Sequence, residues 1–467
     1  MVDKLRAQSE QSLRKLVEWA AAVRFDDLPP SVRRKTALVV TDDLAAMLAA
    51  KEEPEILKIS EQKRRRSTVR EATIFLDGAR TDRYTAALVN AAAGGWCQLD
   101  EGYGKVSCHA GLYVLPALLA EAEAEDLSVA DLLCASAVAY EIVTRIARTW
   151  QWKACPIHVH ARYSAVGAAA GVGLARRLAP HRLMDAISGA AAIGPVGPLD
   201  QMVKGALISN MYAAVGAWSG MHAVEWAEAG IGGLAGSLHD VYGAALNGIC
   251  DPAHLTKDLG REWAIDFGFH KRFACCQRIH AGADAVLDLL PDLPEHNSGH
   301  DIARVVVTTH DPQLSSYEPA NSLATRFSFP HALAAMIVLR HGEAHAFSGA
   351  TLADPDIAEL RRKVEIIPYR PALPWPHDRA VRVEIAFSDG RMFARERLSA
   401  RGSPDQPFSE QEVLDKAKSL CAPIYPRLVP VMFEVIAQSQ KRLGQRWRSV
   451  VEDIASDTGR RKASAAV

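Results

Sequence analysis

"LYVLPALLAEAEAEDLSVADLLCASAVAYEIVTRIART", residues 112–149, is the stretch that decides the fold. Apolar residues recur at helical spacing on both sides of Ser128, and the middle of the stretch is polar. Ser128 stands directly before the second apolar run, where a serine side chain commonly caps the first turn of a helix. We therefore predict two helices joined by a short turn at Ser128.

The same helical pattern extends through most of the first half of the chain. Residues 31–50 begin with a serine that we expect to cap a helix, and residues 163–193 predict a helix pair divided at Pro180. Residues 208–230 continue the pattern and are rich in Ala and Gly. Because small residues let helices approach closely, we predict a compact all-helical domain over residues 1–266.

Strand signals appear only after about residue 267. Residues 302–310 and 363–368 are rich in β-branched side chains. Residues 381–398 alternate between apolar and polar on both sides of Asp389-Gly390, a pair that favours a tight hairpin turn. These segments predict a small sheet.

The fold class that we predict is mainly α, with two domains. The strands and the helical segment 329–342 between them indicate a smaller α+β lid domain over residues 267–402. Helical patterns return in residues 403–467, which we expect to pack back on the first domain, so that the large all-helical domain is built from both chain ends. The last twelve residues, 456–467, predict a disordered tail.

Composition limits the classes of partner. The chain has 467 residues, with 54 Lys and Arg against 55 Asp and Glu, so no overall charge favours nucleic acid or a membrane surface. The apolar run 165–175 is too short to span a bilayer, and residues 1–25 form an amphipathic pattern without the apolar core of a secretory signal. We expect a cytoplasmic protein whose eight cysteines are reduced.

Metal and nucleotide motifs are missing from the sequence. There is no C-x-x-C pair, and the neighbouring Cys275 and Cys276 have side chains that diverge in regular structure, although a disulfide between them stays open. The sequence also lacks a phosphate-binding G-x-x-x-x-G-K-[ST] loop and a G-x-S-x-G elbow. The sequence therefore favours neither a metal site nor a nucleotide-binding site.

Basic and acidic side chains instead gather at the predicted ends of helices. Lys and Arg bind carboxylates, and His and Asp move protons near neutral pH, so these residues would form a site for a small polycarboxylate if the fold brings them together. The candidates are Asp100, Glu101, His109, His158, His160, Lys204, Lys271, Arg272 and His280.

Six segments resemble the MmgE/PrpD family, in the order in which that family carries them. The likeness runs over nearly the whole chain, and the shared order makes it specific. The segments are LDEGYGKVSCHAG (99–111), VLPALLAEAEAEDLSVADLLCASAVAYEIVTRIAR (114–148), HARYSAVGAAAGVGLARRL (160–178), MVKGALISNMYAAVG (202–216), KRFACCQRIHAGADA (271–285) and ATRFSFPHALAAMIV (324–338).

The resemblance implies a homodimer with an active site between the two domains of each chain. Members of this family, such as 2-methylcitrate dehydratase, cis-aconitate decarboxylase and iminodisuccinate epimerase, act on small di- or tricarboxylic acids without metal or organic cofactor. Carried over by position, the resemblance implies two sets of residues. The catalytic set is His109, His160, Lys204 and Asp100, and the substrate-binding set is Lys271, Arg272, His280, Cys276 and Gln98.

Several of these positions depart from the family pattern. Gln98 stands where the lyases have an acidic residue, and Cys276 stands where the decarboxylases have a histidine. A glutamine cannot act as a base, and a thiol moves protons only when its pKa is tuned. Ala274, Ala110 and Arg326 replace a Pro, a Pro and a Lys.

Three hypotheses follow for the function. The leading one is a cofactor-independent lyase for a small polycarboxylate, with hydration or dehydration favoured over decarboxylation because of Gln98 and Cys276. The second is an isomerase or epimerase, which would need two bases such as His109 and His160. The third is a catalytically silent member that binds a metabolite or a protein partner.

Overall fold

The computed structural model describes residues 2–294, 300–421 and 424–456, and the described chain is mainly helical. The stretch 112–149 forms helices α5 (Ala110–Ala124) and α6 (Val129–Thr149). The Ser128 side chain accepts a hydrogen bond from the Asp131 backbone N–H at the start of α6. Both the helix pair and its serine cap are therefore confirmed.

The other helices of the first half also follow the predicted segments. Helix α2 begins at Pro30 with Pro29 at its cap position, so the expected serine cap at Ser31 is wrong. A proline fits the first helical position because its ring presets φ and no N–H is needed there. The bounds are α1 (Val2–Ala22), α2 (Pro30–Ala49), α3 (Pro54–Arg66), α4 (Arg83–Trp96), α7 (Val159–Ala175), α8 (Pro180–Ile193) and α9 (Met211–Glu228).

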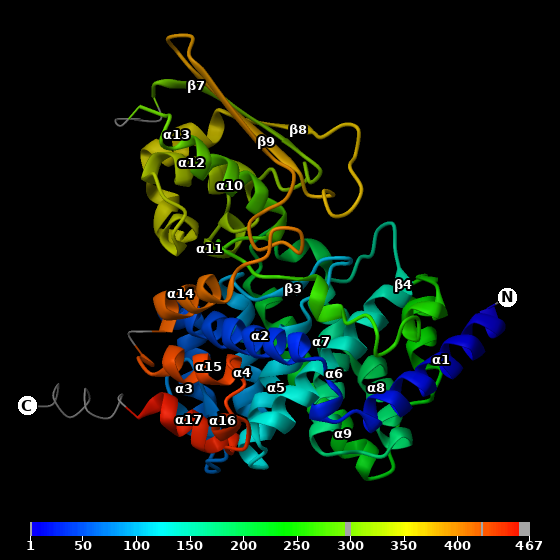
Figure 1. The fold of residues 1–467 in the computed structure, drawn as a ribbon. Coiled ribbons are helices and arrows are strands. Elements are labelled where there is room, and N and C mark those ends of the chain that lie inside the picture. Colours follow the sequence, from blue (N-terminus) through cyan, green and yellow to red (C-terminus); the bar gives the residue numbers. More distant parts are fainter. Residues whose placement is uncertain (1, 295–299, 422–423, 457–467) are drawn as a thin grey trace, which may run out of the picture.

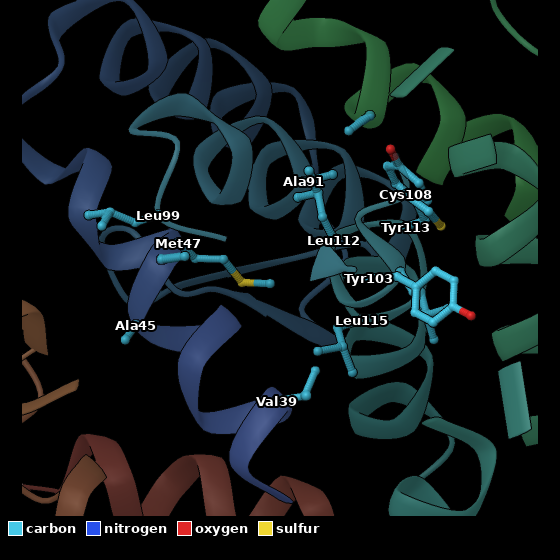
Figure 2. Packing of buried hydrophobic residues seen from close by; sticks show 14 of the residues in the cluster. Val39, Ala45, Met47, Ala91, Leu99, Tyr103, Cys108, Leu112, Tyr113 and Leu115 are labelled. Atoms are coloured by element: carbon cyan, nitrogen blue, oxygen red, sulfur yellow. The ribbon is translucent and has the colours of Figure 1, made fainter. Parts of the chain in front are cut away.

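Helices α2, α4 and α5 pack around a dense apolar cluster. Met47 of α2 and Leu112 of α5 lie close to Gly94 of α4, where an added methyl group would stand 3.1 Å from Leu112. Figure 2 shows Met47 and Leu112 in this cluster together with Tyr103, Cys108 and Tyr113, and Tyr103 and Cys108 also line the cavity described below.

Helix α7 lies between α5 and α9 and approaches both at very short range. A methyl group at Gly167 of α7 would stand 2.7 Å from the Tyr113 Cβ on α5. A methyl group at Gly220 of α9 would stand 2.3 Å from the Ala165 carbonyl oxygen on α7. The small residues of these helices thus let the backbones come together, and this packing fixes the beginning of α7, which carries His160.

A four-stranded sheet lies above the helices in Figure 1. Its strands are β7 (Ile302–Thr309), β8 (Val364–Pro368), β9 (Val381–Phe387) and β10 (Met392–Arg397), in the order β10-β9-β7-β8. Strands β7 and β8 are parallel, and the other pairs are antiparallel. The predicted strands and the hairpin are confirmed, and Gly390 takes the positive φ of 92° that its turn requires.

Helices cover one side of this sheet. α10 packs on β9 and β10, and α12 packs on α10, α13 and β8. Alternate residues of β9 are buried, as a strand with one covered face requires. The bounds are α10 (His280–Leu289), α11 (Ser322–Thr325), α12 (Phe329–Leu339) and α13 (Pro355–Arg362).

The C-terminal helices lie against the N-terminal ones, as the orange and red ribbons show in Figure 1. α14 and α15 pack on α2, and α17 packs on α5. The bounds are α14 (Glu410–Cys421), α15 (Leu428–Ile436), α16 (Gln440–Leu443) and α17 (Trp447–Ala455). The domain boundaries near residues 266 and 402 stay predictions, and the predicted tail beyond residue 456 lies outside the described residues.

Three short strand pairs join segments outside the main sheet, and all but one of their strands lie before residue 267. The prediction of an all-helical region over residues 1–266 is therefore wrong in this detail. The most important pair is β3 (Gly102–Tyr103) with β6 (Gly268–Phe269), because it brings two loops of the cavity together. The others are β1 (Ala72–Ile74) with β2 (Ala79–Thr81) and β4 (Trp150–Gln151) with β5 (Ile249–Cys250). Within the described ranges, no helix has both the length and the apolar character needed to cross a bilayer.

The close contact between α7 and α9 can be tested with one substitution. Gly220→Ala should lower the free energy of unfolding by about 1–3 kcal/mol, because the new methyl group would overlap Ala165 and Ala168. Gly189→Ala in α8 is the control, since the nearest atom to its methyl group is 3.5 Å away and alanine favours a helix by up to ~1 kcal/mol. Urea unfolding measures the free energy of unfolding of both variants. Equal changes in the two variants would contradict the close contact between α7 and α9.

Candidate active site

A cavity of about 640 Å³ lies among the β3 loop, the start of α7 and the segment that follows β6. This volume is within the range of sites for small molecules. Its walls combine histidines and cations with the aromatic and aliphatic side chains of Tyr103, Trp152, Tyr163, Phe269 and Leu314.

Asp100 connects a lysine and a histidine at one side of the cavity. The buried Lys271 ammonium donates to Asp100 Oδ1 at 2.9 Å, and His109 Nδ1 donates to Asp100 Oδ2 at 2.6 Å. Burial alone would raise the pKa of Asp100, but the charge of Lys271 and the hydrogen bond from His109 hold that pKa well below its usual range. The carboxylate is therefore ionised and accepts from Nδ1–H, which leaves the His109 Nε2 lone pair free.

The local fold places these three residues. Pairing of β3 with β6 aligns the loop after α4, which carries Asp100, with the segment that carries Lys271. His109 stands at the cap position of α5, directly before the helix of the quoted stretch. Two segments about 170 residues apart in sequence thus meet at one carboxylate.

His160 lies beside His109 but has the opposite arrangement of hydrogen bonds. The two imidazole rings meet edge to face with their centroids 4.9 Å apart. The Tyr113 hydroxyl lies 3.0 Å from His160 Nδ1, and burial raises the pKa of Tyr113 well above its usual value, so the phenol keeps its proton. We assign this hydroxyl as the donor and the Nδ1 lone pair as the acceptor. His160 therefore carries its own proton on Nε2.

His158 stands at the cap position of α7 and helps to hold His160. Its Nδ1 accepts a hydrogen bond from the His160 backbone N–H at 3.2 Å, and the two rings lie 4.5 Å apart. Burial lowers the pKa of His158 to about 3. The sequence predicted His158 as a candidate together with His160, without a role of its own.

Both central histidines are neutral at pH 7. Burial lowers the pKa of His109 below its ordinary value, although the Asp100 charge opposes this effect. Burial, followed by the nearby His158 and His109, lowers the pKa of His160 well below its ordinary value. The site therefore combines a free imidazole base, His109, with an imidazole N–H donor, His160.

Two arginines of the cavity wall were missed by sequence reasoning. Arg278 pairs with Asp311 at 2.9 Å, and Arg379 reaches the cavity from the segment between β8 and β9. Arg278 belongs to the basic run that follows Lys271, so its position offered a signal. Arg379 carries no such signal, because it follows Lys271 by 108 residues in a proline-rich connection.

Two further predicted residues, Gln98 and Cys276, line the cavity. The Gln98 side-chain amide donates to the Gly95 carbonyl at 2.9 Å, in a backbone with φ of 56°. Burial raises the pKa of the Cys276 thiol, so at neutral pH it is a thiol and not a thiolate.

Lys204, Arg272 and His280 do not line this cavity. The Lys204 side chain is 72% exposed and pairs with Asp200, and Arg272 pairs with Asp284 at 3.4 Å. His280 is buried and contacts the Cys275 carbonyl oxygen through Nε2 at 3.2 Å. Roles for these three residues in the reaction stay predictions.

A second group of carboxyls lies buried behind the cavity. Asp43 accepts from the Glu101 backbone N–H at 3.0 Å, and Glu101 accepts from the Gly111 N–H at 2.5 Å and from the Tyr140 hydroxyl at 3.1 Å. Burial raises the pKa of Glu101 to about 8 and that of Asp43 well above its usual value. These two carboxyls therefore hold protons at neutral pH.

No three His, Cys, Asp or Glu side chains of the described residues gather in an arrangement that could hold a metal ion. All eight cysteines are free thiols, including Cys275 and Cys276, so the structure contains no disulfide between them. The chemistry that the site offers is acid-base and electrostatic.

Comparison with models of known protein families shows the family of this chain. Residues 14–251 match the MmgE/PrpD N-terminal domain, and residues 273–441 match the MmgE/PrpD C-terminal domain. The chain belongs to the MmgE/PrpD family. Asp100, His109 and His160 fall in the first matched region, and Arg379 falls in the second. A search of the curated proteins finds no significant match to the chain.

The raised pKa of Glu101 predicts how stability changes with pH in this MmgE/PrpD member. A carboxyl whose folded-state pKa is raised favours folding at low pH, and this contribution is lost as pH rises from about 4.5 to about 8, by at most about 1.4 kcal/mol per pH unit. Glu101→Gln removes the ionisation but keeps an acceptor for Gly111. Relative to the natural chain, its thermal midpoint should rise steadily between pH 5 and pH 8.

The exposed Glu55 of α3 provides the control for this measurement. Glu55→Gln should follow the natural chain at every pH. A Glu101→Gln variant whose midpoint difference stays constant across this range would show that Glu101 does not hold a proton in the folded state.

Proposed function

We propose that this protein is a lyase of the dehydratase or hydratase type, acting on a small di- or tricarboxylic acid without metal or organic cofactor. The single observation that carries the proposal is the pair of neutral histidines with opposite tautomers beside the Lys271–Asp100 pair. Membership of a family that includes 2-methylcitrate dehydratase supports the reaction class.

In the proposed reaction, His109 Nε2 removes a proton from the carbon next to a substrate carboxylate. The electron pair of the broken C–H bond spreads into that carboxylate. The cations of the cavity wall favour this added negative charge, and their effect is large because the site is partly desolvated. Asp100 supports the imidazolium that forms at His109, because its carboxylate accepts from Nδ1–H.

Water leaves in the second step. The electron pair forms the new carbon–carbon double bond as the bond from carbon to the hydroxyl group breaks. The proton held by His109 passes to the departing oxygen, and the His160 Nε2–H donates a hydrogen bond to it. The products are an unsaturated acid and water, and both histidines return to their neutral forms. Hydration is the same sequence reversed.

An epimerase is the second candidate, because two histidines lie together at the cavity. Their rings are in edge-to-face contact at 4.9 Å, however, whereas a two-base mechanism needs the bases on opposite sides of the reacting carbon. Such a mechanism requires one base to begin as its conjugate acid, so that a proton can return to the opposite face of the carbon. Burial lowers the pKa of both His109 and His160, which disfavours a resting imidazolium. The lyase is therefore the better supported reaction.

His109→Gln tests the proposed base. Turnover should fall by about 10²–10⁴-fold with binding of the acid little changed, because glutamine cannot accept the proton. In the natural chain, kcat/KM should stay level from pH 7 to pH 8 and fall as pH drops through the lowered pKa of His109. The assay follows formation or loss of the alkene by ultraviolet absorbance across citrate, 2-methylcitrate, malate and tartrate.

His254→Gln is the matched control, since His254 lies outside the cavity beside Asp251. It should keep full turnover. A change of chirality without an alkene would favour the epimerase, and tight binding of an acid without any turnover would favour the silent member.

We also propose that the protein forms a homodimer through one face of α9. Val215, Trp218 and Trp226 are exposed along this face, and Trp218 is 40% exposed. His222 lies between the two tryptophans and stacks on Tyr84. A row of exposed aromatic side chains is typical of a surface that a partner covers.

Trp218→Glu should shift the mass measured by light scattering from two chains to one, because a charge would be buried at the contact. The control is Phe433→Glu on α15, where the natural side chain is 55% exposed and far from α9 in sequence and fold. A natural chain that elutes as a monomer at micromolar concentration would contradict this interface.

A further inference from the structure

Arg379 is a cavity cation with no acid of the described residues closer than 3.9 Å. Lys271 is paired with Asp100 at 2.9 Å, and Arg278 is paired with Asp311 at 2.9 Å. The acid nearest to Arg379 in the described chain is its neighbour Asp378, at 3.9 Å, and the buried Arg379 Nε lacks a hydrogen-bond partner. A guanidinium left in this state favours an anion that is absent from the chain itself.

The remaining two cations of the described cavity wall are placed differently. The buried Arg162 Nε also lacks a hydrogen-bond partner, but the Arg162 guanidinium lies over the rings of Trp152 and Tyr163, at 4.5 Å and 5.0 Å from their centroids. Lys153 is exposed to solvent. Arg379 therefore combines partial burial, an unmet charge and a position inside the cavity.

Arg379 also lies near the proposed base. Its guanidinium carbon is 5.5 Å from the centroid of the Phe269 ring, and the same ring meets the His109 imidazole edge to face at 6.2 Å. Arg379 and His109 thus contact the same Phe269 ring. A small acid whose reacting carbon lies at His109 Nε2 is therefore close to Arg379. The planar fork of an arginine can bind both oxygens of a carboxylate at once.

The segment that carries Arg379 is held against the loop that carries His109. Trp375 meets the Phe267 ring at 6.2 Å, and the Lys105 ammonium lies 3.3 Å from the centroid of Phe267. Gly104, next to Lys105, has no room for a side chain, because a methyl group would lie 2.9 Å from the Phe267 carbonyl oxygen. The position of Arg379 therefore depends on this contact.

We propose that Arg379 binds a carboxylate of the substrate and makes the site select acids with more than one carboxylate. The proposal rests on the proposed function for the identity of the anion as a carboxylic acid. The substrate carboxylate is bound by Arg379 of the β8–β9 connection, whereas Lys271 acts by holding Asp100. Trp375 is a positioning residue that holds Arg379 in the cavity.

Calorimetric titration with tricarballylate tests the proposal without turnover, since this saturated tricarboxylate has no hydroxyl group to lose. Arg379→Gln should weaken its binding at least tenfold, and Arg379→Lys should weaken it less. The natural chain should bind tricarballylate at least tenfold more tightly than butyrate, and Arg379→Gln should remove most of that preference. The matched control is Arg382→Gln on β9, whose natural side chain pairs with Glu384 outside the cavity; it should bind as the natural chain does.

Trp375→Ala covers the case in which Arg379→Gln does not fold. It should weaken tricarballylate binding while Arg379 is retained, and Trp375→Phe should restore part of the affinity because a ring still meets Phe267. Unchanged binding in folded Arg379→Gln, or no binding of tricarballylate by the natural chain at millimolar concentration, would overturn the proposal.

The outcomes separate this proposal from the proposed function. Binding that depends on Arg379 in a protein that turns over no acid would support the carboxylate anchor and count against the lyase. Turnover that needs His109 but is unchanged in Arg379→Gln would support the lyase and overturn the anchor.

Discussion

The buried ion pair between Lys271 and Asp100 is the contact on which the site depends. Both side chains are almost fully shielded from water, so removal of either partner would leave an uncompensated buried charge, a change that typically costs about 3–5 kcal/mol. The pair joins the segment after β6 to the loop after α4, and the second oxygen of Asp100 fixes the tautomer of His109. The charge of Lys271 is balanced by Asp100. A carboxylate of a substrate therefore has to pair with another cation.

A set of neighbouring carboxyls imposes a second condition on the fold. Asp42 and Asp43 of α2 and Asp100 and Glu101 of the loop after α4 are all buried, and four adjacent buried negative charges would repel one another strongly. Asp100 is ionised against Lys271, and Asp42 is ionised against Lys416 at 2.7 Å and His270 at 2.8 Å. Asp43 and Glu101 keep their protons instead. Lys416 belongs to helix α14 near the C-terminus, so this helix contributes to the same network of charges as the loop that carries Asp100.

Local sequence predicted the elements of this fold better than it predicted the site. The helix pair around Ser128 and the hairpin at Asp389-Gly390 depend on neighbouring residues, so periodicity and turn chemistry were sufficient. The cap at Ser31 failed because two prolines, Pro29 and Pro30, set the start of α2 two residues earlier. Lys204, Arg272 and Lys271 look alike in sequence, as basic residues at the ends of elements. Only the tertiary packing buries one of them against Asp100 and leaves the other two on surface pairs.

The positive charges near His109 give the site a further property once a substrate is bound. In the free protein, burial, together with the charges of Lys271 and Arg379, lowers the pKa of His109, which keeps the imidazole unprotonated but also makes it a weak base. A carboxylate bound at Arg379 would offset part of that positive charge and bring a negative charge near the ring. Both changes raise the pKa of His109 in the complex, so the base becomes stronger when the acid is in place. Under the proposed function, an anionic ligand would therefore be a better substrate for this histidine than a neutral one, which is a physical reason for the site to favour carboxylic acids.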